Sequence, residues 1–292
     1  MSQRVLVTGA NGQVGNAIIN NKHEYPFELI PINRTVWNMA KEPEKIKALI
    51  KKYQPDIIIN PAAYTNVDKA EEDKETAYAV NTTAVGLLAK ACHQSDIPLL
   101  HVSTDYVFDG TKETPYTEDD PINPINVYGK SKAEGEKLIR EVLEKHVILR
   151  TSWIFSMTHK NFVTKILELG KKLDNLKVIN DQRGCPTAAD CIAKVLMDIT
   201  SKCIKSDAFP WGTYHYSGLP AVSWYEFAEA IFDAKKENHP PMLISCGSTE
   251  YQTKAKRPKY SVMSTLRIKR MLGVLDCNWK EKLVKDLSDT YS

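Results

Sequence analysis

Two side chains at one helical spacing could hold and donate a proton. Tyr128 and Lys132 lie four residues apart in NVYGKSKAEGEK (residues 126–137), where a helix is expected to begin, so both fall on one helix face. A phenol is a weak acid, with a pKa of about 10 in water, but a neighbouring ammonium stabilises the phenolate and lowers that pKa. The pair therefore predicts an acid catalyst that protonates a carbonyl oxygen.

A hydroxyl and a carboxyl precede this pair in the chain. Ser103, Thr104 and Asp105 follow PLLHV (residues 98–102), at the carboxyl end of an expected strand, where open parallel sheets bind their ligands. We expect Thr104 to hydrogen-bond the carbonyl oxygen as hydride arrives and to share the developing negative charge with Tyr128. Tyr and Lys at helical spacing are common, so the order of the three features is what favours this chemistry.

A glycine-rich turn lies near the start of the chain, in VLVTGANGQVG (residues 5–15). Glycines that follow a first buried strand let the backbone approach a pyrophosphate, and the next helix points free N–H groups at the phosphates. The spacing is GxxGxxG rather than GxGxxG, so a plain tight turn stays open as an alternative. Its place as the first strand-to-helix turn favours dinucleotide binding.

The segment PINRTVWNM (residues 31–39) follows the second expected strand and supplies Asn33, Arg34, Asn38 and Met39. An acidic residue here would hold the ribose hydroxyls of NAD, whereas an arginine accommodates the 2′-phosphate of NADP. The segment has an arginine and no acid. We therefore expect NADPH as the cofactor, with NADH also possible.

Strands and helices alternate over the first half of the chain. Apolar runs predict strands buried on both faces at residues 4–7, 27–32, 56–60, 98–103 and 146–150. Helical patterns between them cover residues 13–21, 42–53, 77–94 and 131–145. Such alternation predicts an α/β fold with a Rossmann-type, doubly wound parallel sheet.

The alternation of strands and helices becomes less regular after residue 150. Residues 161–173 and 223–237 still look helical, but residues 237–262 are rich in loops and prolines. We predict a dinucleotide-binding domain over residues 1–150, to which some later elements return. Residues 151–292 are expected to form mainly a smaller substrate-binding lobe.

Composition excludes several classes of protein. A net charge of +3, with acids interleaved among the bases, supports no nucleic-acid binding. No apolar run is long enough for a membrane span and no charged-then-apolar leader opens the chain, so we expect a cytoplasmic protein. The six cysteines form no CxxC pair and have no histidine at ligand spacing, which predicts free thiols and no metal site.

Several motifs together resemble those of the extended short-chain dehydrogenase/reductases, and among them the dTDP-4-dehydrorhamnose reductases. Their order spans nearly the whole chain, and STDYVFDG followed by NVYGKSK is the most specific part. The motifs are TGANGQVG, NPAAYTNVDKAEED, VNTTAVGLLAKAC, STDYVFDG, NVYGKSKAEGEK, RTSW, DQRGCPT and RPKYS.

This resemblance implies NADPH-dependent reduction, at C4, of dTDP-4-dehydro-L-rhamnose to dTDP-L-rhamnose, a step in the biosynthesis of cell-surface polysaccharide. It implies a catalytic trio of Thr104, Tyr128 and Lys132, with Asn81 supporting the lysine. Asp105, Tyr106 and Trp153 would join Thr104 and Tyr128 in contacting the sugar nucleotide. The cofactor would lie against Gly9, Asn11, Gly12, Gln13, Val14, Ala62, Ala63, Tyr64, Asn81, Tyr128 and Lys132.

The chain departs from the family pattern at three places. Many members carry a glutamate soon after the glycine loop that helps to bind a metal at a dimer interface, but here Asn16 and Ala17 stand there. A homodimer is possible, and a metal-bridged one is doubtful. Asn38 replaces a usual acid, and Tyr260 stands where a small polar residue is expected.

Two other functions remain open at this stage. The β subunit of methionine adenosyltransferase keeps the same fold and a YGK motif as a non-catalytic regulatory protein, although RTSW and DQRGCPT favour the reductase. A bifunctional 3,5-epimerase and 4-reductase acting on a UDP- or dTDP-linked sugar would need a further acid/base pair. No histidine or cysteine is a clear candidate for it.

Overall fold

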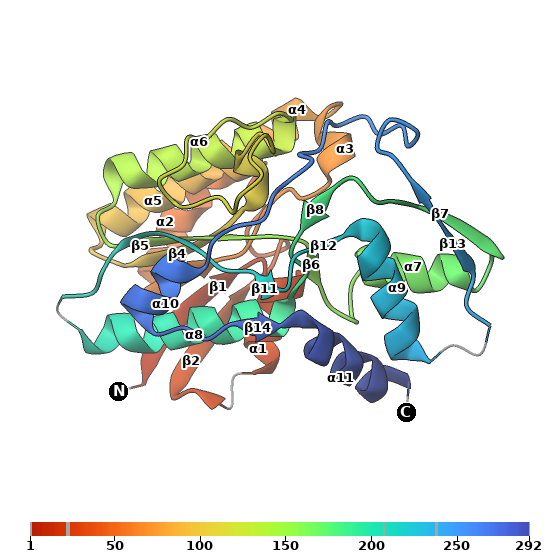
Figure 1. The fold of residues 1–292 in the computed structure, drawn as a ribbon. Helices are drawn as coiled ribbons and strands as arrows, with labels where there is room; N and C mark the ends of the chain where they lie inside the picture. Colours follow the sequence, from red (N-terminus) through yellow and green to blue (C-terminus); the bar gives the residue numbers. More distant parts are fainter. Residues whose placement is uncertain (1, 22–23, 207, 237–238, 292) are drawn as a thin grey trace.

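A computed structural model describes residues 2–21, 24–206, 208–236 and 239–291 of the chain. Its centre is a six-stranded sheet in which every neighbouring pair is parallel (Figure 1). The strand order is β10-β5-β4-β3-β1-β2. These strands are β1 (Gln3–Thr8), β2 (Phe27–Ile32), β3 (Ile57–Asn60), β4 (Leu99–Thr104), β5 (His146–Thr151) and β10 (Gly212–His215). The expected doubly wound parallel sheet is confirmed.

Helices cover both faces of this sheet, because successive strand residues point to opposite sides. Val5, Val7 and Ile59 pack against one helix layer, whereas Leu6 and Ile58 pack against the other. The first layer is α1 (Gln13–Asn20), α8 (Ala189–Lys205) and α10 (Leu266–Leu272). The second is α2 (Ile46–Tyr53), α5 (Ala84–Gln94) and α6 (Val127–Val142), seen above the sheet in Figure 1.

One predicted strand departs from the expected burial. The run Phe27–Ile32 was expected to be buried on both faces, but β2 is the edge strand and alternates between buried and exposed residues. Only one neighbouring strand covers it, so part of it faces solvent. β10, from beyond residue 150, pairs with β5, and α8 packs against α1. The division of the chain at residue 150 itself stays a prediction.

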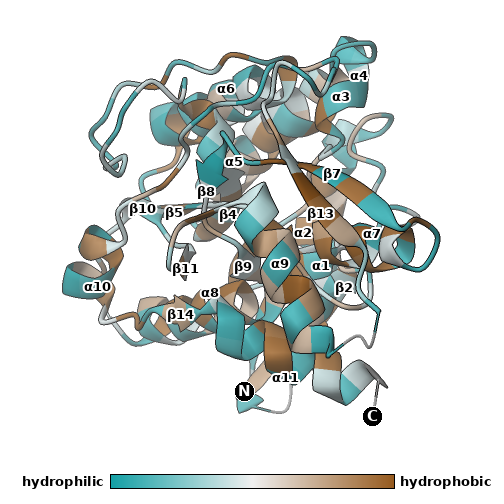
Figure 2. Cartoon of the chain, turned by 45° about the vertical axis from the view of Figure 1, so that its right-hand side comes forward, coloured by the Kyte–Doolittle hydropathy of each residue, from teal (hydrophilic) through white to brown (hydrophobic). Residues whose placement is uncertain are grey.

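A second core lies beside the sheet, under α7 (Phe162–Gly170), α9 (Trp224–Lys235) and α11 (Trp279–Tyr291). Hydrophobic and hydrophilic residues alternate along α9 and α11, as expected of helices that bury one face (Figure 2). The remaining short strands pair as β7 (Asn175–Ile179) with β13 (Met242–Cys246), β6 (Ile154–Phe155) with β9 (Thr187–Ala188), β8 (Arg183–Gly184) with β12 (Val222–Ser223), and β11 (Gly218–Leu219) with β14 (Cys277–Asn278).

Short helical turns lie in the segments that follow β2, β3 and β4. They are α3 (Val67–Ala70), α4 (Lys74–Tyr78), the 3₁₀ turns η2 (Pro43–Lys45) and η4 (Asp105–Val107), and the π-helical turn η3 (Ala79–Thr83). In the described part of the chain, no helix combines the length and the apolar character that a membrane crossing needs.

The expectation that all six cysteines are free thiols is wrong for two of them. Cys191 and Cys277 form a disulfide, with their Cα atoms 6.3 Å apart and a sequence separation of 86 positions. The pairing arises because β14 lies against the start of α8, a contact that local spacing does not reveal. Cys92, Cys185, Cys203 and Cys246 are free.

Candidate functional site

The glycine loop joins β1 to α1 and is packed too tightly for larger residues. Gly9 has a φ of +55°, which favours glycine, and a Cβ placed on it would lie 2.9 Å from Ala62 Cα. A Cβ on Gly15 would lie only 2.2 Å from Gly9 O. Gly12 is the N-cap of α1 and offers no side chain to the free N–H groups. The first turn of α1 is therefore open to an anionic ligand.

A cleft of about 740 Å³ opens in front of this loop, within the range of roughly 300–1,000 Å³ typical of ligand sites. It is bounded by the glycine loop, by the segments that follow β2 and β3, and by the start of α6. All but one of the residues expected to contact the cofactor line it. Those that do are Gly9, Asn11, Gly12, Gln13, Val14, Asn33, Arg34, Asn38, Met39, Ala62, Ala63, Tyr64, Tyr128 and Lys132.

The exception is Asn81, which the resemblance placed beside the catalytic lysine. Its Oδ1 accepts from Tyr64 N at 2.9 Å, and its Nδ2 donates to Tyr64 O at 3.1 Å and to Ser131 Oγ at 3.0 Å. The structure thus engages this side chain with the segment after β3 and with α6 rather than directly with Lys132. Its contact with the cofactor stays a prediction.

The segment after β2 forms one wall of the cleft. Asn33 Oδ1 accepts from Thr35 N at 3.0 Å and from Val36 N at 3.1 Å, which fixes the turn. Arg34 is exposed and lines the cleft. No carboxylate stands between Asn33 and Met39, so nothing in this turn repels a 2′-phosphate.

Tyr128 and Lys132 enter the same cleft from the first turns of α6. Asn126 caps this helix, accepting from Gly129 N at 2.8 Å, and its amide also donates to Lys256 O. Burial raises the pKa of Tyr128 to about 12, with the Thr104 hydroxyl opposing the rise. The lowered pKa expected from the neighbouring ammonium is therefore not found, because burial outweighs it, and Tyr128 is a neutral phenol, the form that donates a proton.

The Lys132 side chain is fully buried, and burial lowers the pKa of its ammonium to about 8, with the Glu136 carboxylate opposing the fall. Its Nζ donates to Val102 O at 2.8 Å and lies 3.1 Å from His101 Nε2. The lysine is therefore held by β4, not by a side chain of its own helix.

Thr104 and Asp105 stand at the carboxyl end of β4. Thr104 Oγ1 accepts from Tyr106 N and donates to Asp105 Oδ1, both at 3.1 Å. Burial raises the pKa of Asp105 to about 7, opposed by the hydroxyls of Ser261 and Thr104. Among the described residues, its buried Oδ2 has no hydrogen-bond partner, so it is free for a ligand.

The expected substrate residues beyond Asp105 lie in aromatic contacts. Tyr106 packs edge-on against Tyr128, with ring centroids 5.9 Å apart. Trp153 stacks flat on Trp224 at 3.4 Å, above Gly184, where a Cβ would lie 2.4 Å from the indole. Thr104, Asp105, Tyr106 and Trp153 do not line the described cleft. Their contact with substrate stays a prediction.

Similarity to known proteins identifies the family. The model described as the RmlD substrate binding domain matches residues 3–292. A dTDP-4-dehydrorhamnose reductase of Aggregatibacter actinomycetemcomitans is 40% identical over 288 residues, which cover 96% of this chain and 97% of that protein. The chain belongs to the RmlD family. The membership expected from the sequence motifs is thereby confirmed.

Solved structures agree with this membership. A dTDP-4-dehydrorhamnose reductase of Clostridium acetobutylicum has a TM-score of 0.93 at 33% identity, covering 99% of this chain and 100% of its own. The corresponding protein of Bacillus anthracis, in complex with NADP, has a TM-score of 0.91 at 32% identity with the same coverage. A Thermus thermophilus UDP-glucose 4-epimerase, at 19% identity and a TM-score of 0.80, shows the shared fold alone.

A loop over residues 156–161 forms hydrogen bonds with the glycine loop and the start of α1 in this RmlD-family chain. Gln13 Oε1 accepts from Ser156 Oγ at 2.9 Å and from Asn161 Nδ2 at 3.0 Å. His159 Nε2 lies 2.7 Å from Asn11 O, and Lys160 also lines the cleft. Sequence reasoning missed these residues, because only the fold brings positions near 160 to positions near 12.

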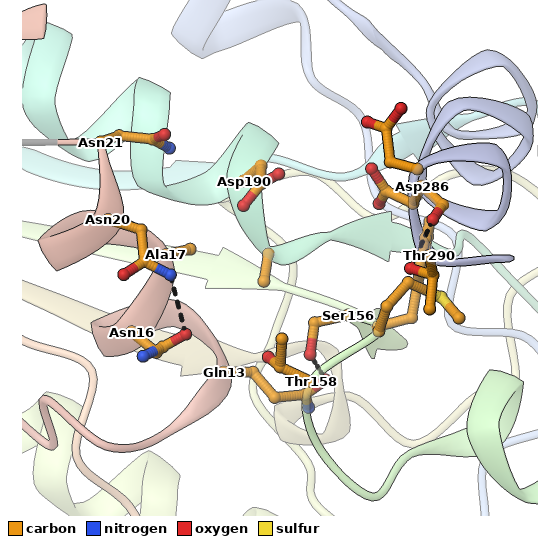
Figure 3. Close-up of a pocket in the computed structure, with 14 residues that line it drawn as sticks. Gln13, Asn16, Ala17, Asn20, Asn21, Ser156, Thr158, Asp190, Asp286 and Thr290 are labelled. Carbon is orange, nitrogen blue, oxygen red and sulfur yellow. Dashed lines mark hydrogen bonds between the residues drawn. The ribbon is translucent and has the colours of Figure 1, made fainter. Parts of the chain in front are cut away.

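A second pocket, of about 240 Å³, contains Asn16, which stands where many family members carry the metal-binding glutamate (Figure 3). The residues around it therefore show whether this chain could bind that metal. Asn16, Asp190 and Asp286 line it, but Lys282 Nζ lies 2.8 Å from a carboxylate oxygen of each aspartate. The ammonium already neutralises the oxygens that a divalent cation would need. These side chains do not fit a metal, and no cluster of three His, Cys, Asp or Glu in the described ranges could hold one.

Proposed function

We propose that this chain reduces the C4 keto group of dTDP-4-dehydro-L-rhamnose to give dTDP-L-rhamnose, with NADPH as the reductant. The observation that carries the proposal is the Tyr128–Lys132 pair in the cleft that the glycine loop also lines. Relatives named dTDP-4-dehydrorhamnose reductase, one of them bound to NADP, favour this activity over the regulatory and epimerase alternatives.

The residues of the chain divide the work between binding and proton transfer. NADPH supplies a hydride to C4 when it is bound in the cleft. Tyr128 Oη donates its proton to the ketone oxygen, and the Lys132 ammonium stabilises the phenolate that remains. The Thr104 hydroxyl turns its proton from Asp105 Oδ1 to the same oxygen and takes up part of its developing charge.

The neighbouring residues keep the cofactor in place for this step. The N–H groups at the start of α1 bind the pyrophosphate. The hydrogen bonds from Ser156 and Asn161 to Gln13 hold that turn in place. Arg34 faces the 2′-phosphate of NADPH. The unpartnered oxygen of Asp105 accepts a hydrogen bond from a sugar hydroxyl. Each assignment uses a group whose polar atoms are otherwise free or open to the cleft.

The test is the fall in NADPH absorbance when the purified chain meets dTDP-4-dehydro-L-rhamnose. We expect rapid oxidation by the wild type, and a loss of turnover by roughly two to four orders of magnitude in Tyr128→Phe. NADPH binding, followed by its fluorescence, should survive the substitution, because the phenyl ring keeps its place. An active Tyr128→Phe variant would exclude Tyr128 as the acid. Absence of turnover by a wild type that binds NADPH would refute the activity.

We also propose that a homodimer of this chain forms without a metal bridge and that the protein works in the cytoplasm, where NADPH and nucleotide sugars are made. The Lys282 ammonium between Asp190 and Asp286 supports the first point. Light scattering with and without EDTA should give the same mass. A dimer that dissociates in EDTA would contradict the assignment. Cell fractionation tests the compartment.

A further inference from the structure

One buried titratable side chain beside the site has no part in the mechanism above. His101 lies on β4 with no exposed surface. Its Nε2 is 3.1 Å from Lys132 Nζ, and its Nδ1 is 2.9 Å from the amide nitrogen, Nδ2, of Asn60 on β3. The Asn60 side chain contacts the hydroxyl of Thr8 on β1. A continuous polar row therefore crosses three adjacent strands and ends at Lys132.

The sheet places this row by simple alternation. Leu6, Ile58 and Leu99 face the layer of α5 and α6, so Thr8, Asn60 and His101, each two residues further along its strand, face the same layer. Asn60 and His101 are direct neighbours in the parallel register of β3 and β4. Polar residues thus replace apolar ones at the last position of β1 and of β3 and in the middle of β4, where α6 presents Lys132.

The charge state of the row follows from its chemistry. Burial, with a further contribution from the Lys132 ammonium, holds the pKa of His101 well below its usual range, so the ring is neutral. A neutral imidazole has one N–H and one accepting nitrogen. An ammonium only donates. Nε2 must therefore accept from Lys132, and the single N–H must lie on Nδ1. For that N–H to have an acceptor, the Asn60 amide must flip, so that Oδ1 instead of Nδ2 faces Nδ1 and Nδ2 donates to the Thr8 hydroxyl.

We propose that His101 is a positioning residue that accepts a hydrogen bond from Lys132 and holds it as an oriented ammonium beside Tyr128. The proposal rests on the reductase function proposed above, since it gives the lysine its catalytic role. Without the imidazole, Lys132 would keep one partner in the described structure, the carbonyl of Val102. Asn60 contacts the imidazole of His101, and Thr8 contacts Asn60. Together they fix which ring nitrogen carries the proton.

The groups that face Lys132 set the direction of the effect. Glu136, on α6, favours the ammonium, and it is itself paired with Arg150 on β5. Tyr128 is the titratable neighbour one turn earlier on α6. His101, on β4, is the neutral acceptor. Removing this acceptor leaves the burial of the ammonium unchanged but takes away a bond to the charged form, so the pKa of Lys132 should fall further.

The first experiment is the pH profile of kcat at saturating substrate. In His101→Leu we expect the basic limb to move down by about one pH unit, which lowers kcat at pH 8 by roughly fivefold or more beyond any loss seen at pH 6. His101→Gln, whose side-chain carbonyl reaches toward the position of Nε2, should restore most of the limb. His101→Asn, whose shorter side chain reaches the position of Nδ1, should not.

The control is Leu100→Val, which changes a buried residue of the same strand on the opposite sheet face. Its basic limb should coincide with that of the wild type. If His101→Leu folds and keeps the wild-type limb, the proposal is overturned. If it does not fold, the Gln and Asn variants decide the matter, and equal limbs for the two would overturn the proposal.

A second experiment needs no turnover. Nitrogen-15 NMR of the histidines, without substrate or cofactor, should show His101 neutral, with the proton on Nδ1 and a bare Nε2; the signal is assigned by its loss in His101→Gln. A proton on Nε2 would overturn the proposal even in an active enzyme. The expected tautomer in a protein that reduces no keto sugar would instead uphold the His101–Lys132 contact and refute the proposed function.

Discussion

Arg150→Met should cost more stability than most single substitutions, because it leaves a carboxylate buried without its main partner. Glu136 has no exposed surface and accepts from Arg150 Nε at 2.9 Å and from Arg150 Nη2 at 2.7 Å. Breaking a buried pair on one side costs about 3–5 kcal/mol. At roughly 2–4 °C per kcal/mol for a chain of this size class, Tm should fall by about 6–20 °C.

A matched control is available on the same carboxylate. Arg140 Nη1 also donates to Glu136, at 3.0 Å, but its side chain is 35% exposed. Arg140→Met should cost about 0–1 kcal/mol, because a solvated partner contributes little. Differential scanning calorimetry of both variants and of the wild type, in one buffer at pH 7, measures the contrast. The thermal transitions are comparable only where they are reversible.

The pKa of Glu136 determines how the loss of stability in Arg150→Met should change with pH. Arg150 holds the folded pKa of Glu136 down to about 2, against an ordinary value of 4.5. The pair therefore contributes its full stabilisation above about pH 4.5, and that contribution is lost as the pH falls toward 2. In Arg150→Met the buried carboxyl should take up a proton, so the gap in Tm between variant and wild type should be smaller at pH 5 than at pH 8. Equal losses in the two arginine variants, or a gap that widens at pH 5, would refute the reasoning.

Two further substitutions test the cofactor cleft. Gly15→Ala should weaken NADPH binding and cost about 1–3 kcal/mol of stability, because the new Cβ would meet Gly9 O at 2.2 Å. Gly247→Ala, whose Cβ would lie 3.6 Å from Glu250 Oε1 in ordinary van der Waals contact, is the control in calorimetry and fluorescence titration. Arg34→Glu should raise KM for NADPH by roughly tenfold or more and leave KM for NADH nearly unchanged, because only NADPH carries the 2′-phosphate. Parallel losses for both cofactors would argue against that contact.

Local patterns in the sequence predicted the parts of the site that depend on one element and its neighbouring turn. The strand that ends at Thr8 and the glycines after it follow from a buried apolar run and a tight turn. The shared face of Tyr128 and Lys132 follows from helical spacing alone. Both patterns extend over only a few residues, so they can be recognised without knowledge of the tertiary fold.

Contacts between distant segments were beyond such patterns. His101 reaches Lys132 across 31 positions, and Cys191 reaches Cys277 across 86. The only sequence feature that pointed to the contact between His101 and Lys132 was a polar residue at position 101, in a run expected to be buried on both faces. Nothing comparable marked the cysteines, since their pairing depends on how β14 meets α8. Asn81 was assigned by resemblance. Its side chain contacts Tyr64 and Ser131, and its part in supporting Lys132 stays a prediction.

The opposite pKa shifts of Tyr128 and Lys132 suit a proton donor that must wait for its acceptor. Burial raises the pKa of Tyr128 to about 12, so the phenol keeps its proton at neutral pH. Burial lowers the pKa of Lys132 only to about 8, so its ammonium persists there as well. Both groups are consequently protonated before reaction, and the proton leaves the phenol only when the negative charge that develops on the ketone oxygen makes that oxygen basic enough to accept it. Such a site should lose activity as the pH rises through about 8, where the lysine and not the tyrosine gives up its proton.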